Sequence, residues 1–244
     1  MCSSPLSFLG GVDTSTGKIL DGDSDAKGMS VSHKVLCFPF GKGSTVGSYA
    51  MYQLRLNDLA PAAIINSSAE PIVATGAIIA DIPMVDGIDV NLLRTGDRLV
   101  VDADDASVEI VDVPEKHVVT SILKDRSKIL LLQRSERVGS FKGQWAGVSG
   151  FVEHGETDEE AVLREMEEEI GSNKLRLLKH AEPQRFRDGE VVWCVHPFLF
   201  EVRDPDIRTD WEHKKFEWVA PEDVAKYQTV PGLQQVVSAL LGRR

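Results

Sequence analysis

The stretch of this chain that most limits its possible folds runs from Gly150 to Gly171 and reads GFVEHGETDEEAVLREMEEEIG. Thr157 or Asp158 can cap the start of a helix, helix-favouring residues follow, and the closing glycine can end the helix. Apolar residues recur along it at helical spacing, namely Val162, Met166 and Ile170. The pattern therefore predicts a helix over residues 157–170 that packs on a core along one apolar stripe.

The same helix carries an acidic face. Glu165, Glu168 and Glu169 stand at positions i, i+3 and i+4, which places their carboxylates side by side. Such carboxylates repel one another unless a hard divalent cation binds among them, so we expect Mg²⁺ or Mn²⁺ here. This ion would neutralise a substrate diphosphate and activate water, with Glu165 as a catalytic residue. Arg164 is expected to orient a carboxylate and to contact the substrate.

An ordinary solvated acidic helix is the alternative, and the residues around the helix disfavour it. They complete the template G-x5-E-x7-R-E-U-x-E-E-x-G, in which U is bulky and aliphatic. The matching positions are Gly150, Glu156, Arg164, Glu165, Met166, Glu168, Glu169 and Gly171. The segment resembles the Nudix box, and the resemblance covers roughly residues 115–244. It implies a Nudix α/β/α sandwich and Mg²⁺-dependent hydrolysis of a diphosphate.

Three details refine this resemblance. Glu212 lies where many Nudix proteins keep a further carboxylate near the metal, with an exposed turn residue as the alternative. Ser172 departs from the aliphatic residue that usually ends the box, which concerns packing after the helix and not the metal ligands. Nudix-like isopentenyl-diphosphate isomerases need a catalytic cysteine in the loop before the helix. Because this loop has no cysteine, isomerase activity is disfavoured.

Charge and composition restrict the partners of the chain. Its 244 residues carry a formal net charge of −11, which argues against nucleic acid as the main partner. No apolar run approaches the roughly 20 residues of a membrane span, and the N-terminus lacks the basic region of a signal peptide. We therefore expect a cytoplasmic protein. A change of composition near the turn signal Val113-Pro114 predicts two domains, residues 1–113 and 114–244.

A glycine-rich loop, FPFGKGSTVGSY at residues 38–49, marks the first domain and does not fit the P-loop pattern. It leads into a helix expected over residues 48–59, whose N-terminus favours an anionic ligand. The alternative is that the glycines only permit a tight turn and that Ser44 caps the helix. The other segments read as strands at 33–40 and 61–66, strand-turn-strand at 70–87, and a hairpin at 95–113. Together they predict a β-rich α/β domain.

Four blocks of this domain, within about residues 5–112, resemble the swivel-domain subunit of the aconitase-X family, in its archaeal phosphomevalonate dehydratase branch. They are PLSFLGGVDTSTGKI, VLCFPFGKGSTVGSYAMYQL, APAAIINSSAEPIVATGAIIADIP and TGDRLVVDA. The resemblance implies a swivelling β/α domain that closes over an iron–sulfur active site on a separate large subunit. It makes Ser44 the catalytic base, with Lys42, Gly43 and Thr45 as substrate-binding neighbours. Glu70 also lies in a matching block and ranks below Ser44.

The cysteines support the need for a partner. Cys2, Cys37 and Cys194 are scattered, whereas a [4Fe–4S] cluster takes closely spaced cysteine thiolates. The chain is therefore not expected to hold the cluster alone. The aconitase-X large subunit would supply it, in a heterodimer or a larger complex.

The combined interpretation is a dehydratase small subunit fused to a Nudix hydrolase. The first would dehydrate mevalonate 5-phosphate to trans-anhydromevalonate 5-phosphate, and the second would act on a phosphorylated small molecule, with an isoprenoid diphosphate suggested by the fusion alone. Three alternatives stay open. The first domain could be a structural appendage of a Nudix enzyme, the Nudix domain could sense a diphosphate without hydrolysing it, or the dehydratase could act on another hydroxy acid.

Overall fold

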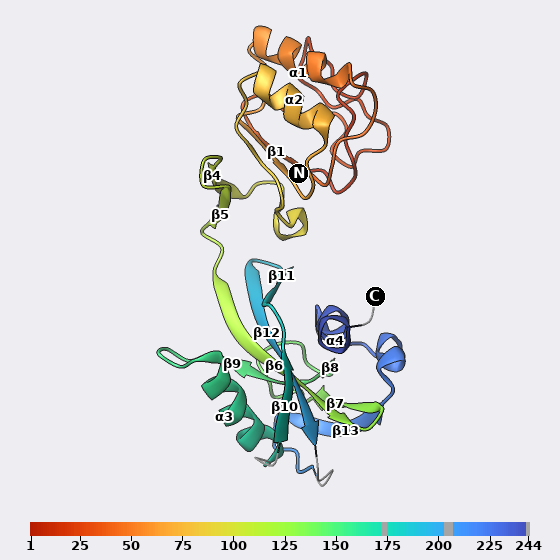
Figure 1. Cartoon of the computed structure of the whole chain (residues 1–244), viewed down its shortest axis with the longest axis vertical. Coiled ribbons are helices and arrows are strands. Elements are labelled where there is room, and N and C mark those ends of the chain that lie inside the picture. Colours follow the sequence, from red (N-terminus) through yellow and green to blue (C-terminus); the bar gives the residue numbers. More distant parts are fainter. Residues whose placement is uncertain (172–174, 203–206, 243–244) are drawn as a thin grey trace. The chain divides into compact units, whose positions relative to one another are not determined.

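The computed structural model describes residues 1–171, 175–202 and 207–242, so Ser172 lies outside the described part. The chain divides into two compact units, Met1–Val113 and Pro114–Arg244 (Figure 1). Among the described residues, no helix combines the length and apolarity that crossing a bilayer requires.

The first unit is built on a small parallel sheet in the order β1-β2-β3. Its strands are β1 (Val35–Phe38), β2 (Ala63–Asn66) and β3 (Met84–Val85). Helices α1 (Gly47–Leu56) and α2 (Pro71–Ile79) connect them, and a short helix η1 (Val90–Leu92) follows. A separate hairpin, β4 (Arg98–Asp102) with β5 (Ser107–Val111), ends the unit as expected.

One sequence expectation is wrong in this unit. Residues 70–87 were expected to form strand, turn and strand, but they form α2 followed by β3. Pro71 at the first helical position favours a helix start, and the buried residues Val73, Gly76 and Ala77 have helical spacing. A side chain at Gly76 would collide with Met51 of α1, so the glycine permits the two helices to pack closely. The short apolar run did not distinguish a buried helix from a buried strand.

The second unit is a mixed eight-stranded sheet in the order β10-β12-β6-β7-β13, with β11 on β12, β8 on β7 and β9 on β6. Its strands are β6 (Glu115–Asp125), β7 (Lys128–Arg134), β8 (Trp145–Ala146), β9 (Val148–Phe151), β10 (Leu175–His180), β11 (Gln184–Asp188), β12 (Val191–Val202) and β13 (His213–Val219). Its helices are α3 (Asp158–Ile170), η2 (Pro221–Lys226) and α4 (Leu233–Leu241).

The two faces of this sheet are covered by different helices. In β7, Leu130 and Leu132 belong to the core under α3, whereas Ile129 and Leu131 belong to the core under α4 (Figure 1). Alternate residues of a strand point to opposite faces, so the continuous run ILLL reflects burial on both sides. This confirms the predicted α/β/α sandwich.

Candidate active site

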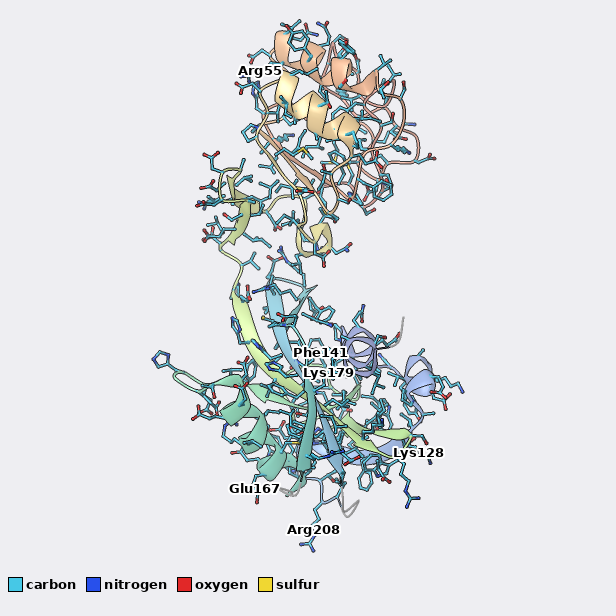
Figure 2. All side chains as sticks on the ribbon, viewed as in Figure 1. Arg55, Lys128, Phe141, Glu167, Lys179 and Arg208 are labelled. Carbon is cyan, nitrogen blue, oxygen red and sulfur yellow. The ribbon has the colours of Figure 1, made fainter. Side chains whose placement is uncertain are left out.

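Helix α3 begins and ends where the sequence predicts. Thr157 caps it: its side chain accepts a hydrogen bond from the Glu160 backbone N–H at 3.2 Å, and Glu160 Oε2 accepts one from the Thr157 N–H at 2.9 Å. Gly171 ends the helix in the left-handed conformation at φ 63°. Glu167 projects away from the sheet into solvent (Figure 2). The two caps fix where the helix begins and ends, and its apolar residues Val162, Met166 and Ile170 pack into the core.

Arg164 is the centre of a hydrogen-bond network at this helix. Its Nε and Nη2 donate to the two carboxylate oxygens of Glu156 at 2.9 and 3.0 Å, and Nη2 also donates to the Phe151 carbonyl at 2.9 Å. Nη1 donates to Glu165 Oε1 at 2.6 Å and lies 3.4 Å from Glu168 Oε2. The hydrogen bond from Arg164 lowers the pKa of Glu156, which therefore stays ionised. Arg164 thus joins the loop, β9 and the helix, and it fixes the orientation of Glu165.

The three box carboxylates differ sharply in exposure. The side chain of Glu169 is 3% exposed and that of Glu165 is 12% exposed, whereas that of Glu168 is 60% exposed. Burial, followed by the charges of Glu165 and Glu212, raises the pKa of Glu169 well above 4.5. Burial also raises the pKa of Glu165. Glu165 and Glu169 therefore lie inside the site, and Glu168 stands at its exposed edge.

One carboxylate oxygen of Glu169 lacks a hydrogen-bond partner among the described residues. Its Oε1 accepts a weak hydrogen bond from the Ser149 N–H at 3.4 Å, but within the described residues its Oε2 has none. Oε2 lies 3.7 Å from His213 Nε2, and burial lowers the pKa of His213, which favours a neutral ring. A buried carboxylate oxygen that lacks a hydrogen-bond partner and lies beside other carboxylates suits a hard divalent cation, which prefers oxygen ligands. The residues present therefore fit Mg²⁺ or Mn²⁺.

The residues before β13 complete the acidic group. Glu212, noted from the sequence, is close enough for its charge to raise the pKa of both Glu165 and Glu169. The sequence interpretation missed Asp210 and His213, which lie 3.3 Å apart through Asp210 Oδ1 and His213 Nδ1. Their proximity to Glu212 in the sequence was the only signal that pointed to them.

Gly150 has a steric role in this site. A Cβ added there would lie less than 3.0 Å from all three carboxylate atoms of Glu165, a distance that real Cβ atoms essentially never show. The glycine lies in β9 and pairs with Val119 of β6, so the backbone cannot retreat. The box therefore begins with glycine because the carboxylate of Glu165 occupies the place of a side chain.

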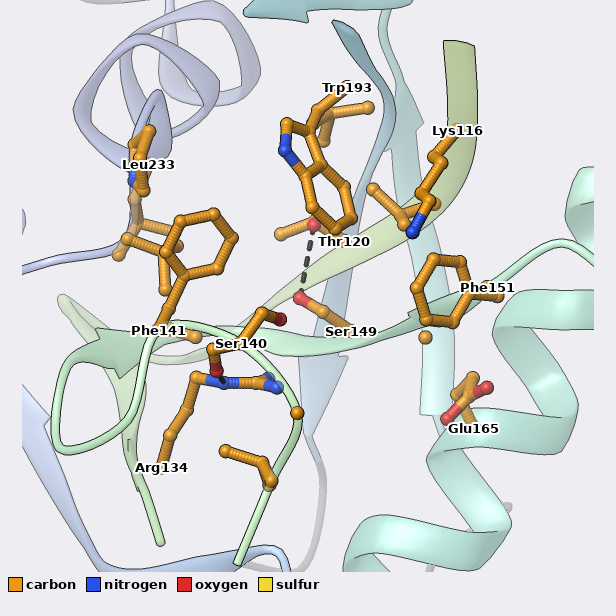
Figure 3. A pocket seen from close by; sticks show the side chains of 18 of the residues that line it. Lys116, Thr120, Arg134, Ser140, Phe141, Ser149, Phe151, Glu165, Trp193 and Leu233 are labelled. Atoms are coloured by element: carbon orange, nitrogen blue, oxygen red, sulfur yellow. Dashed lines mark hydrogen bonds between the residues drawn. The ribbon is translucent and has the colours of Figure 1, made fainter. Parts of the chain in front are cut away.

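A pocket of about 540 Å³ opens beside the carboxylates, with Glu165 among its lining residues (Figure 3). Aromatic rings form part of its lining. The Lys116 ammonium lies 5.7 Å from the ring centre of Phe151 and 5.6 Å from that of Trp193. Phe141 packs against Trp193 with ring centres 5.6 Å apart. The pocket thus offers apolar surface and two cations, Lys116 and Arg134, beside the acidic group.

The candidate site of the first unit is the loop that precedes α1. Gly43 has φ 107°, a conformation that favours glycine, and Ser44 is exposed and accepts a hydrogen bond from the Val46 N–H at 3.4 Å. This contact precedes the helix, since the residue at the N-cap is Val46 itself. The loop leads into a helix as expected, and Ser44 and Thr45 are exposed just before α1.

Lys42 and Glu70 flank this loop in different ways. The Lys42 ammonium lies 3.1 Å from Asp21 Oδ2 and 3.6 Å from Asp23 Oδ2, so its charge is balanced within the chain. Glu70 is the residue before α2, and a Cβ added at Gly41 would collide with Val73 and lie 4.0 Å from Glu70 Oε2. The N-termini of α1 and α2 thus both adjoin the glycine loop.

The geometry first defines a class. The second unit is an α/β/α sandwich whose capped helix presents clustered carboxylates, suited to a divalent cation, beside a pocket. The comparisons with known proteins then give the families. Residues 1–110 match the family described as aconitase X swivel domain, and residues 115–240 match the NUDIX domain family.

Individual relatives agree with these matches. The phosphomevalonate dehydratase small subunit of Thermococcus kodakarensis is 61% identical over 108 residues, 44% of this chain and 81% of the relative. That of Pyrococcus abyssi is 55% identical over 107 residues, 44% of this chain and 82% of the relative. The chain therefore belongs to the aconitase X swivel family through its first unit and to the Nudix family through its second.

Two solved structures are also similar. The holo-form of aconitase X from Thermococcus kodakaraensis is 60% identical, with a TM-score of 0.45, over 45% of this chain and 84% of the other. The MutT protein of Methanosarcina mazei Go1 is 25% identical, with a TM-score of 0.45, over 52% of this chain and 94% of the other.

Proposed function

We infer that this chain is the small subunit of an iron–sulfur phosphomevalonate dehydratase, fused to a Mg²⁺-dependent Nudix diphosphate hydrolase. The first half of the inference is supported by relatives named phosphomevalonate dehydratase small subunit, which are 51–62% identical to this chain. The second half is supported by Glu169 Oε2, which is buried among carboxylates and has no hydrogen-bond partner among the described residues.

In the dehydratase, Ser44 is the residue proposed to accept the proton next to the substrate carboxylate. Its exposure at the start of α1 leaves Oγ accessible to a substrate, and the N–H groups of this helix start favour negative charge there. Lys42, Gly43 and Thr45 would hold the anionic groups of mevalonate 5-phosphate. An iron–sulfur cluster of the large subunit would supply the Lewis acid that takes the hydroxyl group.

The cysteines agree with an external cluster. All three are free and buried, and Cys194 lies in the other unit from Cys2 and Cys37. They do not form the closely spaced thiolate set that a [4Fe–4S] cluster takes. The large subunit is therefore proposed as the partner that brings both the cluster and most of the active site.

An anaerobic pull-down with the tagged full-length chain tests this proposal. We expect a larger protein and iron to co-purify, and the purified complex to dehydrate mevalonate 5-phosphate. Ser44→Ala should keep the complex and its iron but lose the dehydration activity by at least about 100-fold. Ser67→Ala, a hydroxyl substitution after β2 and outside the glycine loop, serves as a control. A chain that is recovered alone and without iron would refute the dehydratase half.

In the Nudix half, the residues of α3 have distinct proposed roles. Glu165 and Glu169 bind the cation from inside, Glu168 binds it from the exposed edge, and Arg164 holds Glu165 in place. Bound Mg²⁺ would neutralise the diphosphate and lower the pKa of a bound water. Because Glu165 also lines the pocket, we propose that it accepts the proton of the attacking water.

The matched test for hydrolysis uses two substitutions on the same helix. Glu169→Gln removes a buried carboxylate and should abolish Mg²⁺-dependent release of phosphate or diphosphate. Glu167→Gln changes the same residue type on the solvent side and should leave the rate unchanged. A Glu169→Gln variant that hydrolyses as fast as the unmodified chain would refute the hydrolase. A chain that binds diphosphates without hydrolysing them would instead be a sensor.

The pocket beside Glu165 supports a proposal for the substrate class. Its aromatic walls suit an apolar or planar group attached to a diphosphate, and fusion to a dehydratase of this kind favours an isoprenoid diphosphate. Hydrolysis of isoprenyl diphosphates should be measured beside that of nucleoside triphosphates. A preference for nucleotides, with no reaction on isoprenyl diphosphates, would end the isoprenoid hypothesis and leave the hydrolase intact.

A further inference from the structure

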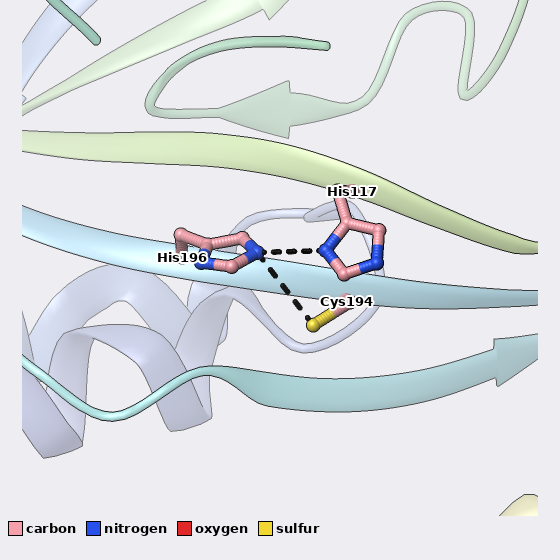
Figure 4. A group of neighbouring side chains, drawn as sticks. All are labelled: His117, Cys194 and His196. Atoms are coloured by element: carbon pink, nitrogen blue, oxygen red, sulfur yellow. Dashed lines mark hydrogen bonds between the residues drawn. The ribbon is translucent and has the colours of Figure 1, made fainter. Parts of the chain in front are cut away.

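A second group of metal-ligating side chains lies in the second unit, away from the carboxylates. In the pairing of β6 with β12, Cys194 is the partner of His117, and His196 follows two residues later on the same face (Figure 4). Their neighbours Lys116, Val118, Trp193 and Val195 line the pocket on the opposite face. Because alternate residues point to opposite sides of a sheet, this His–Cys–His cluster is separate from the proposed substrate pocket.

The potential ligand atoms of the cluster converge. One ligand atom from each of His117, Cys194 and His196 lies within 4.8 Å of the other two. His117 Nδ1 is 3.0 Å from His196 Nε2, and Cys194 Sγ is 3.7 Å from the same nitrogen (Figure 4). Two ring nitrogens and a sulfur bound tetrahedrally to Zn²⁺ would be about 3.3 Å and about 3.6 Å apart, from typical bond lengths. The observed separations are close to these values.

The outer nitrogens of both imidazoles face carboxylates. Asp158 Oδ2, at the start of α3, lies 2.6 Å from His196 Nδ1, although off the direction of a good N–H hydrogen bond. Glu115 Oε1 lies 3.7 Å from His117 Nε2 and accepts a hydrogen bond from Arg185 at 3.0 Å. Histidines that bind metals commonly direct their second nitrogen to a carboxylate, which fixes the ring and strengthens it as a ligand. Both rings here have a carboxylate beside the outer nitrogen, and their inner nitrogens face each other and the thiol.

We propose that His117 Nδ1, Cys194 Sγ and His196 Nε2 bind a zinc ion. Nitrogen and thiolate ligands favour Zn²⁺ over Mg²⁺ or Ca²⁺, which prefer oxygen. Binding replaces the thiol proton, which leaves to solvent, by the metal. Three protein ligands leave the fourth tetrahedral position to water. His117 is exposed, which gives the ion a route from solvent, whereas Cys194 and His196 are buried.

The zinc ion would connect three elements of the sandwich. His117 belongs to β6, Cys194 and His196 belong to β12, and Asp158 is the first residue of α3. Glu165 follows Asp158 by about two helical turns, or roughly 10 Å, so the zinc site and the carboxylate site do not share ligands. A zinc ion here would stabilise the second unit and anchor the start of the box helix.

The test uses Co²⁺ in place of Zn²⁺ on the full chain, because a thiolate bound to Co²⁺ gives a charge-transfer absorption that carboxylates do not. We expect this absorption in the unmodified chain, with one equivalent of Zn²⁺ abolishing it. His117→Ala should weaken Zn²⁺ competition at least about tenfold, and Asp158→Asn by about 10–100-fold. His154→Ala, an exposed histidine outside the cluster, is the matched control and should change nothing.

Loss of the thiolate absorption in Cys194→Ser, but not in Cys37→Ser, would identify Cys194 as the residue whose sulfur binds the metal. Because Cys194 is buried, its substitution could unfold the unit, and the exposed His117→Ala variant keeps the proposal testable in that case. The alternative to a zinc site is a metal-free cluster in which the same three side chains only form hydrogen bonds with one another. Absence of the charge-transfer band in the unmodified folded chain, or a His117→Ala variant that binds Zn²⁺ as tightly, would overturn the proposal.

Discussion

The substitution Gly150→Ala should displace the side chain of Glu165 without unfolding the protein. The added Cβ would lie less than 3.0 Å from the Glu165 carboxyl carbon and both of its oxygens. β9 is held by its pairing with β6, so the side chain of Glu165 has to move and the strand does not. The carboxylate would have to shift by at least about 1.6 Å to restore ordinary contact, and this shift breaks its 2.6 Å hydrogen bond from Arg164.

The expected magnitudes differ for activity and for stability. Misplacing a catalytic group by about 1 Å costs on the order of 100-fold in rate. Losing one charge-assisted hydrogen bond costs about 1.5–3 kcal/mol of unfolding free energy, and part of this is recovered because the displaced carboxylate of Glu165 can reach water. We therefore expect a fold that survives with a rate that falls at least about 100-fold.

Two assays measure these effects. Binding of Mn²⁺, followed by electron paramagnetic resonance, reports on the carboxylates without knowledge of the substrate, and Mg²⁺-dependent hydrolysis reports on the rate. Tryptophan fluorescence in denaturant reports on the second unit alone, because all four tryptophans lie in it. Gly22→Ala is the control, since its added Cβ would meet nothing within 4 Å. A Gly150→Ala variant with unchanged Mn²⁺ affinity and hydrolysis would show that the close approach to Glu165 has no functional role.

Three further substitutions test the same site. Burial raises the pKa of Glu169 above its ordinary 4.5. In metal-free protein its stabilising contribution is therefore complete below about pH 4.5 and is lost as the pH rises through the folded-state pKa. Over that interval Glu169→Gln should gain stability relative to the unmodified chain, and a difference between the two denaturation curves that does not change with pH would contradict this. Saturating Mn²⁺ should stabilise the unmodified chain and not this variant, by about 2.7 kcal/mol at 100 times the dissociation constant. Arg164→Lys cannot make the paired hydrogen bonds to Glu156, so unfolding of the second unit should become easier by about 1.5–3 kcal/mol; equal denaturation midpoints would refute the role of the network. Thr157→Ala removes one half of the capping box with Glu160 and should cost about 1 kcal/mol in the same assay, whereas no loss would show that the cap is redundant.

The sequence predicted best what depends on neighbours along the chain. The bounds of α3 follow from a threonine cap and a terminating glycine, both of which act within one turn of the helix. The pairing of Arg164 with box carboxylates also follows from local spacing. By contrast, residues 71–80 are almost entirely apolar, and local preference alone did not decide between helix and strand there. The close packing of Gly76 against Met51 is a contact of the helix.

Tertiary structure decided which of the acidic side chains are buried and what lies beside them. Spacing placed Glu165, Glu168 and Glu169 on one face, but only the docking of α3 on the sheet buries Glu169 and leaves Glu168 exposed. The sheet also brings His213 to Glu169. Parallel pairing of β6 with β12 brings His117 next to Cys194. The sequence by itself thus determined the helix and its charges, because caps and spacing act locally. The burial that gives those charges their chemistry depends on contacts between distant segments, which no local pattern encodes.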